Sequence, residues 1–159
     1  MKAIDDTTGN SREAMTQYAA LCYRKSSKNG VEILLVTSRD TGRWVLPKGW
    51  PMKGRTGPES ALGEAYEEAG VEGRISDRPI GLYSYDKGMD DGMLQPCVVT
   101  VYPVEVQKLR RKFPERAERK RRWFLPAKAA RKVDEPELRE LLSAFDLSAP
   151  PSQAGNGKA

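Results

Sequence analysis

A chain of 159 residues is long enough for one domain with a buried core, and 31% of its residues are charged against 38% that are hydrophobic. No apolar run approaches the ~18 residues that a membrane helix needs, and the polar N-terminus is unlike a secretory signal, so we expect a cytoplasmic protein with no membrane partner. The absence of histidine excludes His-dependent triads and His-ligated zinc, while the net charge of +5 favours an anionic partner.

Two cysteines, Cys22 and Cys97, each lie within an apolar run and are predicted to be buried free thiols. A cysteine nucleophile would need an activating base, which is usually histidine. With neither histidine nor reactive thiols, a metal ion must be held by oxygen ligands. This favours a hard cation such as Mg²⁺ or Mn²⁺.

The order of the predicted elements favours a mixed sheet flanked by helices. We expect strands at residues 18–24, 31–38, 44–46, 74–86, 93–106 and 122–125. Short helices are expected at 126–132 and 136–145, after an irregular Gly- and Pro-rich loop at 47–57. We expect one domain over residues 1–159, with an ordered core at about 16–148 and loosely attached polar termini that include residues 1–15 and the tail from 149.

The main helix has a well-marked beginning and end. Thr56 and Glu59 have the spacing of a capping box, and Pro58 is tolerated in the first turn, where its missing N–H is not needed. Gly70 stands where a left-handed residue commonly ends a helix.

Three glutamates of this helix, Glu64, Glu67 and Glu68, lie at i, i+3 and i+4 and project from nearly one face. Each like-charge pair costs roughly 0.2–0.5 kcal/mol, and a negative charge in the last turn costs roughly 0.3–1 kcal/mol more. No basic residue stands beside them in the sequence to offset these costs. A solvated acidic face is the alternative, but a divalent cation between the carboxylates would turn the repulsion into coordination, and we favour this interpretation.

Gly49, Glu64, Glu67, Glu68 and Gly70 stand at the spacing of the Nudix box, with the apolar positions of that box filled by Ala65 and Val71. The chain therefore resembles the Nudix hydrolases. The segments TSRDTGRWVLPKGW and RKRRWF are similar to the branch that hydrolyses diphosphoinositol polyphosphates and diadenosine polyphosphates, and the likeness covers about residues 17–145.

This resemblance implies an α/β (α+β) fold, an α/β/α sandwich with a mixed central sheet. It implies that Glu64 and Glu68, together with Gly49, bind Mg²⁺ or Mn²⁺, and that Glu67 is the base. All three glutamates are then catalytic, in the hydrolysis of a phosphoanhydride bond. Which box glutamate acts as the base differs among Nudix enzymes.

Two positions depart from the box, since Arg55 replaces its first glutamate and Gly63 replaces its arginine. In the family, that arginine is expected to orient the neighbouring carboxylates. Two outcomes remain open: the site is reorganised around Arg55, Lys48 or Lys53, or catalysis is weakened.

Polar and basic residues near the expected cleft are candidates for substrate binding: Arg24, Ser38, Arg39, Lys48, Gly49, Lys53 and Lys87. The segment 108–122 adds nine basic residues, which form either a solvated surface or an electropositive rim that attracts polyphosphates. We expect an anionic small-molecule substrate rather than nucleic acid, because this segment has a single interior aromatic, Phe113. The alternatives are an RNA 5′-pyrophosphohydrolase and a catalytically weakened nucleotide-binding module. The sequence does not indicate an oligomeric state.

Overall fold

The computed structural model describes residues 12–145, which form an eight-stranded sheet with helices on both faces. The strands are β1 (Met15–Ser26), β2 (Gly30–Thr37), β3 (Trp44–Val45), β4 (Lys48–Gly49), β5 (Val71–Ile75), β6 (Gly81–Gly88), β7 (Leu94–Leu109) and β8 (Arg121–Phe124). The helices are α2 (Gly57–Ala69), α3 (Pro126–Lys132) and α4 (Pro136–Ala144), with a short 3₁₀ helix at Arg116–Glu118.

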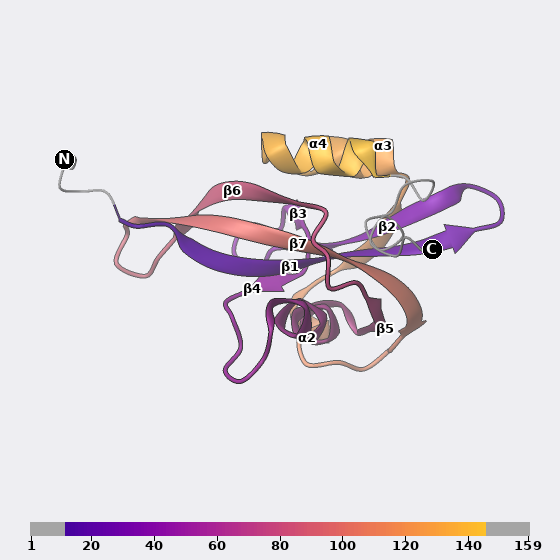
Figure 1. The fold of residues 1–159 in the computed structure, drawn as a ribbon, viewed down its shortest axis with the longest axis horizontal. Coiled ribbons are helices and arrows are strands. Elements are labelled where there is room, and N and C mark those ends of the chain that lie inside the picture. Colours follow the sequence, from indigo (N-terminus) through magenta and orange to yellow (C-terminus); the bar gives the residue numbers. More distant parts are fainter. Residues whose placement is uncertain (1–11, 146–159) are drawn as a thin grey trace.

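The sheet is mixed, as expected. Its centre is the parallel pair β1–β7, while the other pairings are antiparallel. The long strand β7 pairs with β1 along one edge. Along its other edge it pairs with β6 in its first half and with β5 in its second half. Helix α2 covers one face, and α3 and α4 cover the opposite face (Figure 1). The predicted α/β/α sandwich is therefore confirmed.

Alternating side chains of the central strands fill two cores, one on each face of the sheet. In β1, Ala19 and Leu21 face α3 and α4, whereas Ala20 and Cys22 face α2. Helix α2 contributes its small side chains to the second core, all fully buried: Ala61, Ala65 and Ala69. Their size brings the helix axis close to the sheet, which places the glutamates of α2 beside the loop around β4.

Helix α2 is capped as the sequence predicted. The Glu59 amide donates to Thr56 Oγ1 at 3.2 Å, and the Thr56 amide donates to Glu59 Oε1 at 2.8 Å. Gly70 ends the helix with φ of 69°, in the left-handed region. Cys22 and Cys97 are buried and free, also as predicted. None of the helices described is long and apolar enough to cross a bilayer.

The expected strand at 74–86 is wrong, because the structure has two strands, β5 and β6, separated by a loop at 76–80. Pro79 in this loop has no N–H to donate to a neighbouring strand. The chain therefore leaves β7 after Ile75 and returns to it at Gly81, so that β5 and β6 pair with different halves of that strand.

Residues 12–15, part of the segment expected to be loosely attached, contact the β6–β7 hairpin. Arg12 forms an ion pair with Asp91 at 2.8 Å, and Gln95 Nε2 donates to the Glu13 carbonyl at 2.8 Å. Met15 already pairs with β7. The expectations for residues 1–11, for 146–148 and for the tail from 149 lie outside the described residues.

Candidate active site

Glu64 reaches across to β4, where Gly49 leaves room for it. Gly49 pairs with Tyr18 of β1, so its backbone is held by the sheet. A Cβ built at Gly49 would overlap the Glu64 carboxylate. The glycine is therefore required for the close approach of α2 to this loop, and it brings the backbone of β4 next to a carboxylate.

The Glu68 carboxylate is buried next to that of Glu64, with only 6% of the residue exposed. Its Oε1 accepts a hydrogen bond from the Lys48 amide at 3.3 Å. Burial raises the pKa of Glu68 to about 8, an effect that the Arg119 guanidinium opposes. Burial also raises the pKa of Glu64, although a hydrogen bond between the two carboxyl groups lowers it. Burial and proximity therefore disfavour the doubly ionised pair, and a bound cation would oppose this effect.

The cation nearest to Glu68 is Arg119, a residue that sequence reasoning missed as an individual site residue. Arg119 Nη2 lies 3.5 Å from Glu68 Oε2, and both side chains are less than 10% exposed. Arg119 Nε donates to Glu115 Oε1 at 2.7 Å, and Nη1 donates to the Thr37 carbonyl at 2.9 Å. Its only sequence signal was membership of the basic segment 108–122, which did not distinguish it from eight similar residues.

The segment between β7 and β8 runs around the C-terminal end of α2 (Figure 1). The Glu115 amide donates to the Glu67 carbonyl at 2.9 Å, and the Arg110 amide donates to the Gly70 carbonyl at 2.8 Å. Arg121 Nη1 donates to the Ala69 carbonyl. This segment satisfies backbone carbonyls at the helix end and places a guanidinium at its negative pole. No basic residue stands beside the glutamates in the sequence. The positive charge near them comes instead from the segment between β7 and β8, which is distant in the sequence.

These elements enclose a polar cleft with a volume of about 300 Å³. Eight residues predicted for the site line it: Ser38, Arg39, Lys48, Gly49, Glu64, Glu67, Glu68 and Lys87. Six further lining residues were not predicted: Gln17, Asp40, Val45, Trp50, Glu115 and Arg119. The structure thus brings the three glutamates together with several cationic side chains, an arrangement suited to a multiply charged anion.

The structure does not bring Arg24 and Lys53 to this cleft. Arg24 donates to Glu32 Oε1 at 2.7 Å and lies over the Trp123 ring, towards the far end of β1. Lys53 is an exposed residue of the loop before α2 and does not line the cleft. Neither position supports the predicted contact with substrate.

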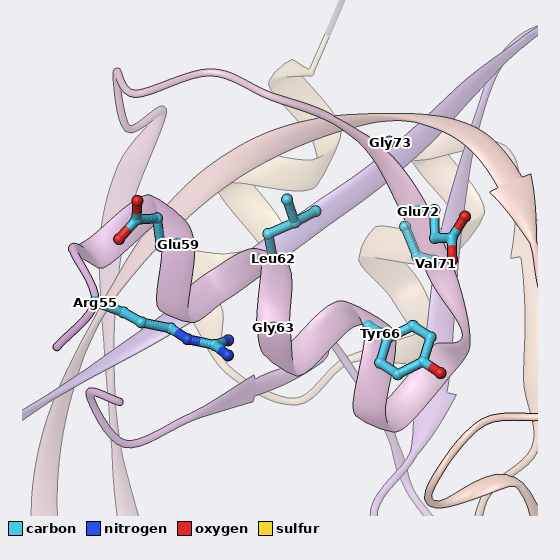
Figure 2. Close-up of a pocket in the computed structure, with 8 residues that line it drawn as sticks. All are labelled: Arg55, Glu59, Leu62, Gly63, Tyr66, Val71, Glu72 and Gly73. Carbon is cyan, nitrogen blue, oxygen red and sulfur yellow. The ribbon is translucent and has the colours of Figure 1, made fainter. Parts of the chain in front are cut away.

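Arg55 also lies outside the cleft, on another side of α2. Figure 2 shows it extending along the helix towards Gly63, in an open hollow of about 710 Å³. A Cβ at position 63 would lie 2.7 Å from Arg55 Nη1, so the arginine occupies the space that a side chain there would need. Of the three basic residues around which a reorganised site was expected, Lys48 lines the cleft, whereas Arg55 and Lys53 do not.

The donors at the base of the cleft fit a hard divalent cation. Within residues 12–145, no group of three or more Asp, Glu, Cys or His side chains is arranged to hold a metal, so Glu67 does not complete a three-carboxylate site. Glu64 and Glu68 do approach each other, and they lie beside the Gly49 backbone. One or two carboxylates, with water and substrate phosphates, are the usual ligands of Mg²⁺, so this pair is compatible with that ion.

Comparison with solved structures places the fold among known proteins. It is similar to that of a C. elegans Ap4A hydrolase, with a TM-score of 0.59 and 18% sequence identity over 82% of this chain and 95% of the other. At this identity the likeness concerns the fold alone. A sequence model of the NUDIX domain matches residues 15–145, which contain the sheet, α2 and the cleft. The chain belongs to the Nudix family, as the box residues predicted.

Curated relatives agree with this assignment. Diphosphoinositol polyphosphate phosphohydrolase 3-beta of Homo sapiens is 30% identical over 146 residues, 89% of this chain and 83% of the relative. Nudix hydrolase 12, mitochondrial, of Arabidopsis thaliana is 33% identical over 99 residues, 60% of this chain and 49% of the relative. The chain thus spans about half the length of this plant relative.

Proposed function

We propose that this protein hydrolyses phosphoanhydride bonds in nucleoside or inositol polyphosphates, with Mg²⁺ or Mn²⁺ as cofactor. The observation that carries the proposal is the pair of adjacent carboxylates at the base of a cleft with cationic walls, Glu68 buried and Glu64 half-buried. Two such groups repel each other when both are ionised, and a divalent cation relieves that repulsion while adding affinity for phosphate.

Each box residue has a role in this proposal. Glu64 and Glu68, with the backbone of Gly49, would hold the cation, which would polarise the phosphate and lower the pKa of a bound water. Glu67 lines the same cleft, and within residues 12–145 its side chain forms neither a hydrogen bond nor an ion pair. It is thus available as a general base that takes a proton from the attacking water, a contribution of about 10²–10⁴-fold.

The walls of the cleft supply positive charge for the remaining phosphate oxygens. Lys48 is partly buried with its ammonium 5.0 Å from the Tyr85 ring, and burial lowers its pKa. Arg39 and Lys87 reach the cleft from β2–β3 and β6. Arg39 lies 3.1 Å from Glu118, an exposed ion pair that a phosphate can replace at small cost.

The name of a sequence relative supports this substrate class, since it is a diphosphoinositol polyphosphate phosphohydrolase. The RNA 5′-pyrophosphohydrolase alternative depends on the basic segment 108–122. Arg119 and Arg121 of that segment are engaged inside the protein, with Glu68 and with the end of α2. Fewer of its charges therefore face solvent than the sequence suggested.

The proposal is tested by incubating the purified protein with diphosphoinositol polyphosphates, diadenosine polyphosphates and 5′-triphosphorylated RNA. Each substrate is assayed with Mg²⁺, with Mn²⁺ and with EDTA, and the released phosphate and nucleotide products are measured. We expect metal-dependent hydrolysis of at least one of the two small-molecule classes. Hydrolysis of RNA alone would favour the alternative enzyme. Ligand-induced stabilisation without any product would favour the binding module.

A further inference from the structure

Arg119 is held between two glutamates in a geometry that leaves it little freedom. Its side chain is 9% exposed, and its three guanidinium nitrogens contact three different partners: Glu68, Glu115 and the carbonyl of Thr37. Two of these contacts are hydrogen bonds, to Glu115 and to Thr37, and they restrict the rotamers of Arg119 so that Nη2 stays 3.5 Å from Glu68 Oε2.

We propose that Arg119 is a positioning residue, which with Glu115 as its counter-charge holds the Glu68 carboxylate in the orientation that the reaction needs. The inference rests on the proposed function, because it concerns the carboxylate to which that function assigns the cation. Arg119 would thus place a guanidinium next to a box glutamate in a chain whose box arginine is replaced by Gly63.

The segment carrying Arg119 is fixed on both sides. On one side, the Glu115 amide donates to the Glu67 carbonyl at 2.9 Å. On the other, Lys120 and Thr37 exchange two hydrogen bonds, at 2.9 Å to Thr37 Oγ1 and 3.0 Å to the Lys120 carbonyl. These bonds connect Arg119 both to α2 and to the end of β2. A displacement of Arg119 towards the middle of the cleft would break its own contacts.

The distances indicate how the charge is shared. Arg119 is closer to Glu115, at 2.7 Å, than to Glu68, at 3.5 Å. Glu115 thus holds most of the guanidinium charge, and Glu68 receives a weaker contact on Oε2 while Oε1 faces the Lys48 amide. Glu68 is oriented from two directions and keeps lone pairs for a further ligand.

The basic residues closer in sequence do not supply this contact. The Arg55 guanidinium lies at Gly63 in the hollow of Figure 2, and the Lys48 ammonium lies over the Tyr85 ring. Arg119 is the ion-pair partner of Glu68 within the described part of the chain.

The test compares Arg119→Ala and Arg119→Lys with Arg131→Ala, a matched charge loss at an exposed position of α3 on the other face of the sheet. If Arg119 positions Glu68, Arg119→Ala should lower kcat by about 10- to 100-fold with KM little changed, the usual effect of removing such a partner. Lysine should restore part of the loss, and Arg131→Ala should resemble the wild type. A raised KM with an unchanged kcat would overturn the positioning role and make Arg119 a substrate contact.

A double-mutant cycle with Glu68→Gln tests the coupling directly, both in kcat and in the urea unfolding of the metal-free protein. We expect Arg119→Ala to lower kcat much less when Glu68 is already glutamine, because Arg119 acts on the reaction through that carboxylate. In unfolding we expect the two changes to be non-additive, although Arg119→Ala still removes the contacts with Glu115 and Thr37. Additive effects in both measurements would overturn the inference. If Arg119→Ala does not fold, Glu115→Gln enters the same cycle, because it removes the counter-charge and keeps the arginine.

The two proposals fail in different ways. A wild-type protein that hydrolyses no polyphosphate with any metal refutes the proposed function, whereas the unfolding cycle still decides whether Arg119 holds Glu68. An active wild type whose kcat is unaffected by Arg119→Ala and Arg119→Lys refutes the positioning role alone.

Discussion

Replacing Gly49 with alanine tests the close approach on which the cleft depends. A Cβ at this position would overlap the Glu64 carboxylate, and it would lie 2.9 Å from Glu64 Oε1. The clash involves the end of a flexible side chain. The φ of Gly49 is not positive, so alanine can adopt the same backbone conformation. We therefore expect Glu64 to move while the fold is retained.

The displacement sets the size of the effect. Restoring ordinary van der Waals separation requires the carboxylate to retreat by about 1 Å. A misplacement of about 1 Å at a catalytic group costs about 10²-fold in rate. Gly49→Ala should thus lower kcat by about 10²-fold and leave the melting temperature of the metal-free protein nearly unchanged.

The assay is steady-state hydrolysis at saturating Mg²⁺, using the best substrate of the panel described above. The control is Gly88→Ala, since a Cβ at Gly88 meets nothing within 4 Å and its φ is not in the left-handed region. Wild-type kcat in both variants would refute the claim that the position of Glu64 is critical. Loss of folding in Gly49→Ala would refute the claim that the clash is relieved by the side chain.

Three further predictions follow from single contacts. Glu68→Gln should lower turnover by about 10²-fold or more at saturating metal, while Glu140→Gln, an exposed change on α4, should not. Burial raises the pKa of Glu68 to about 8 from its ordinary 4.5, so the folded state keeps a proton that the unfolded state loses. The stability of the metal-free protein should therefore fall as pH rises from about 5 to about 8.5, and Glu68→Gln should reduce this fall. Thr56→Ala removes the capping hydrogen bond of α2 and should lower the free energy of unfolding by about 1 kcal/mol.

Each of these has a clear contrary result. Unchanged turnover in Glu68→Gln removes that residue from the mechanism. Melting curves in EDTA at several pH values decide the second prediction, which is wrong if wild type and Glu68→Gln respond alike. Urea titration decides the third, and a Thr56→Ala protein as stable as wild type would show that the cap contributes nothing.

Local features of the sequence were sufficient to predict α2 and the carboxylates that it carries. The capping box of Thr56 and Glu59 and the left-handed Gly70 involve contacts within four residues, so their geometry follows from the backbone of one helix. The side-by-side placement of Glu64 and Glu68 follows from the helical repeat. The family pattern added Gly49, whose contact with Glu64 joins two segments that no local rule connects.

Tertiary structure alone decided which basic residues meet these carboxylates. Arg119 and Glu115 belong to the segment that runs around the end of α2, whereas Arg55, much closer in sequence, lies on another side of the helix. The split of the expected strand at 74–86 has a similar origin, since it depends on how β7 is shared between two partners. Periodicity and capping act over a few residues, but a charge–charge contact depends on distance in space, and chain folding sets that distance independently of separation in the sequence.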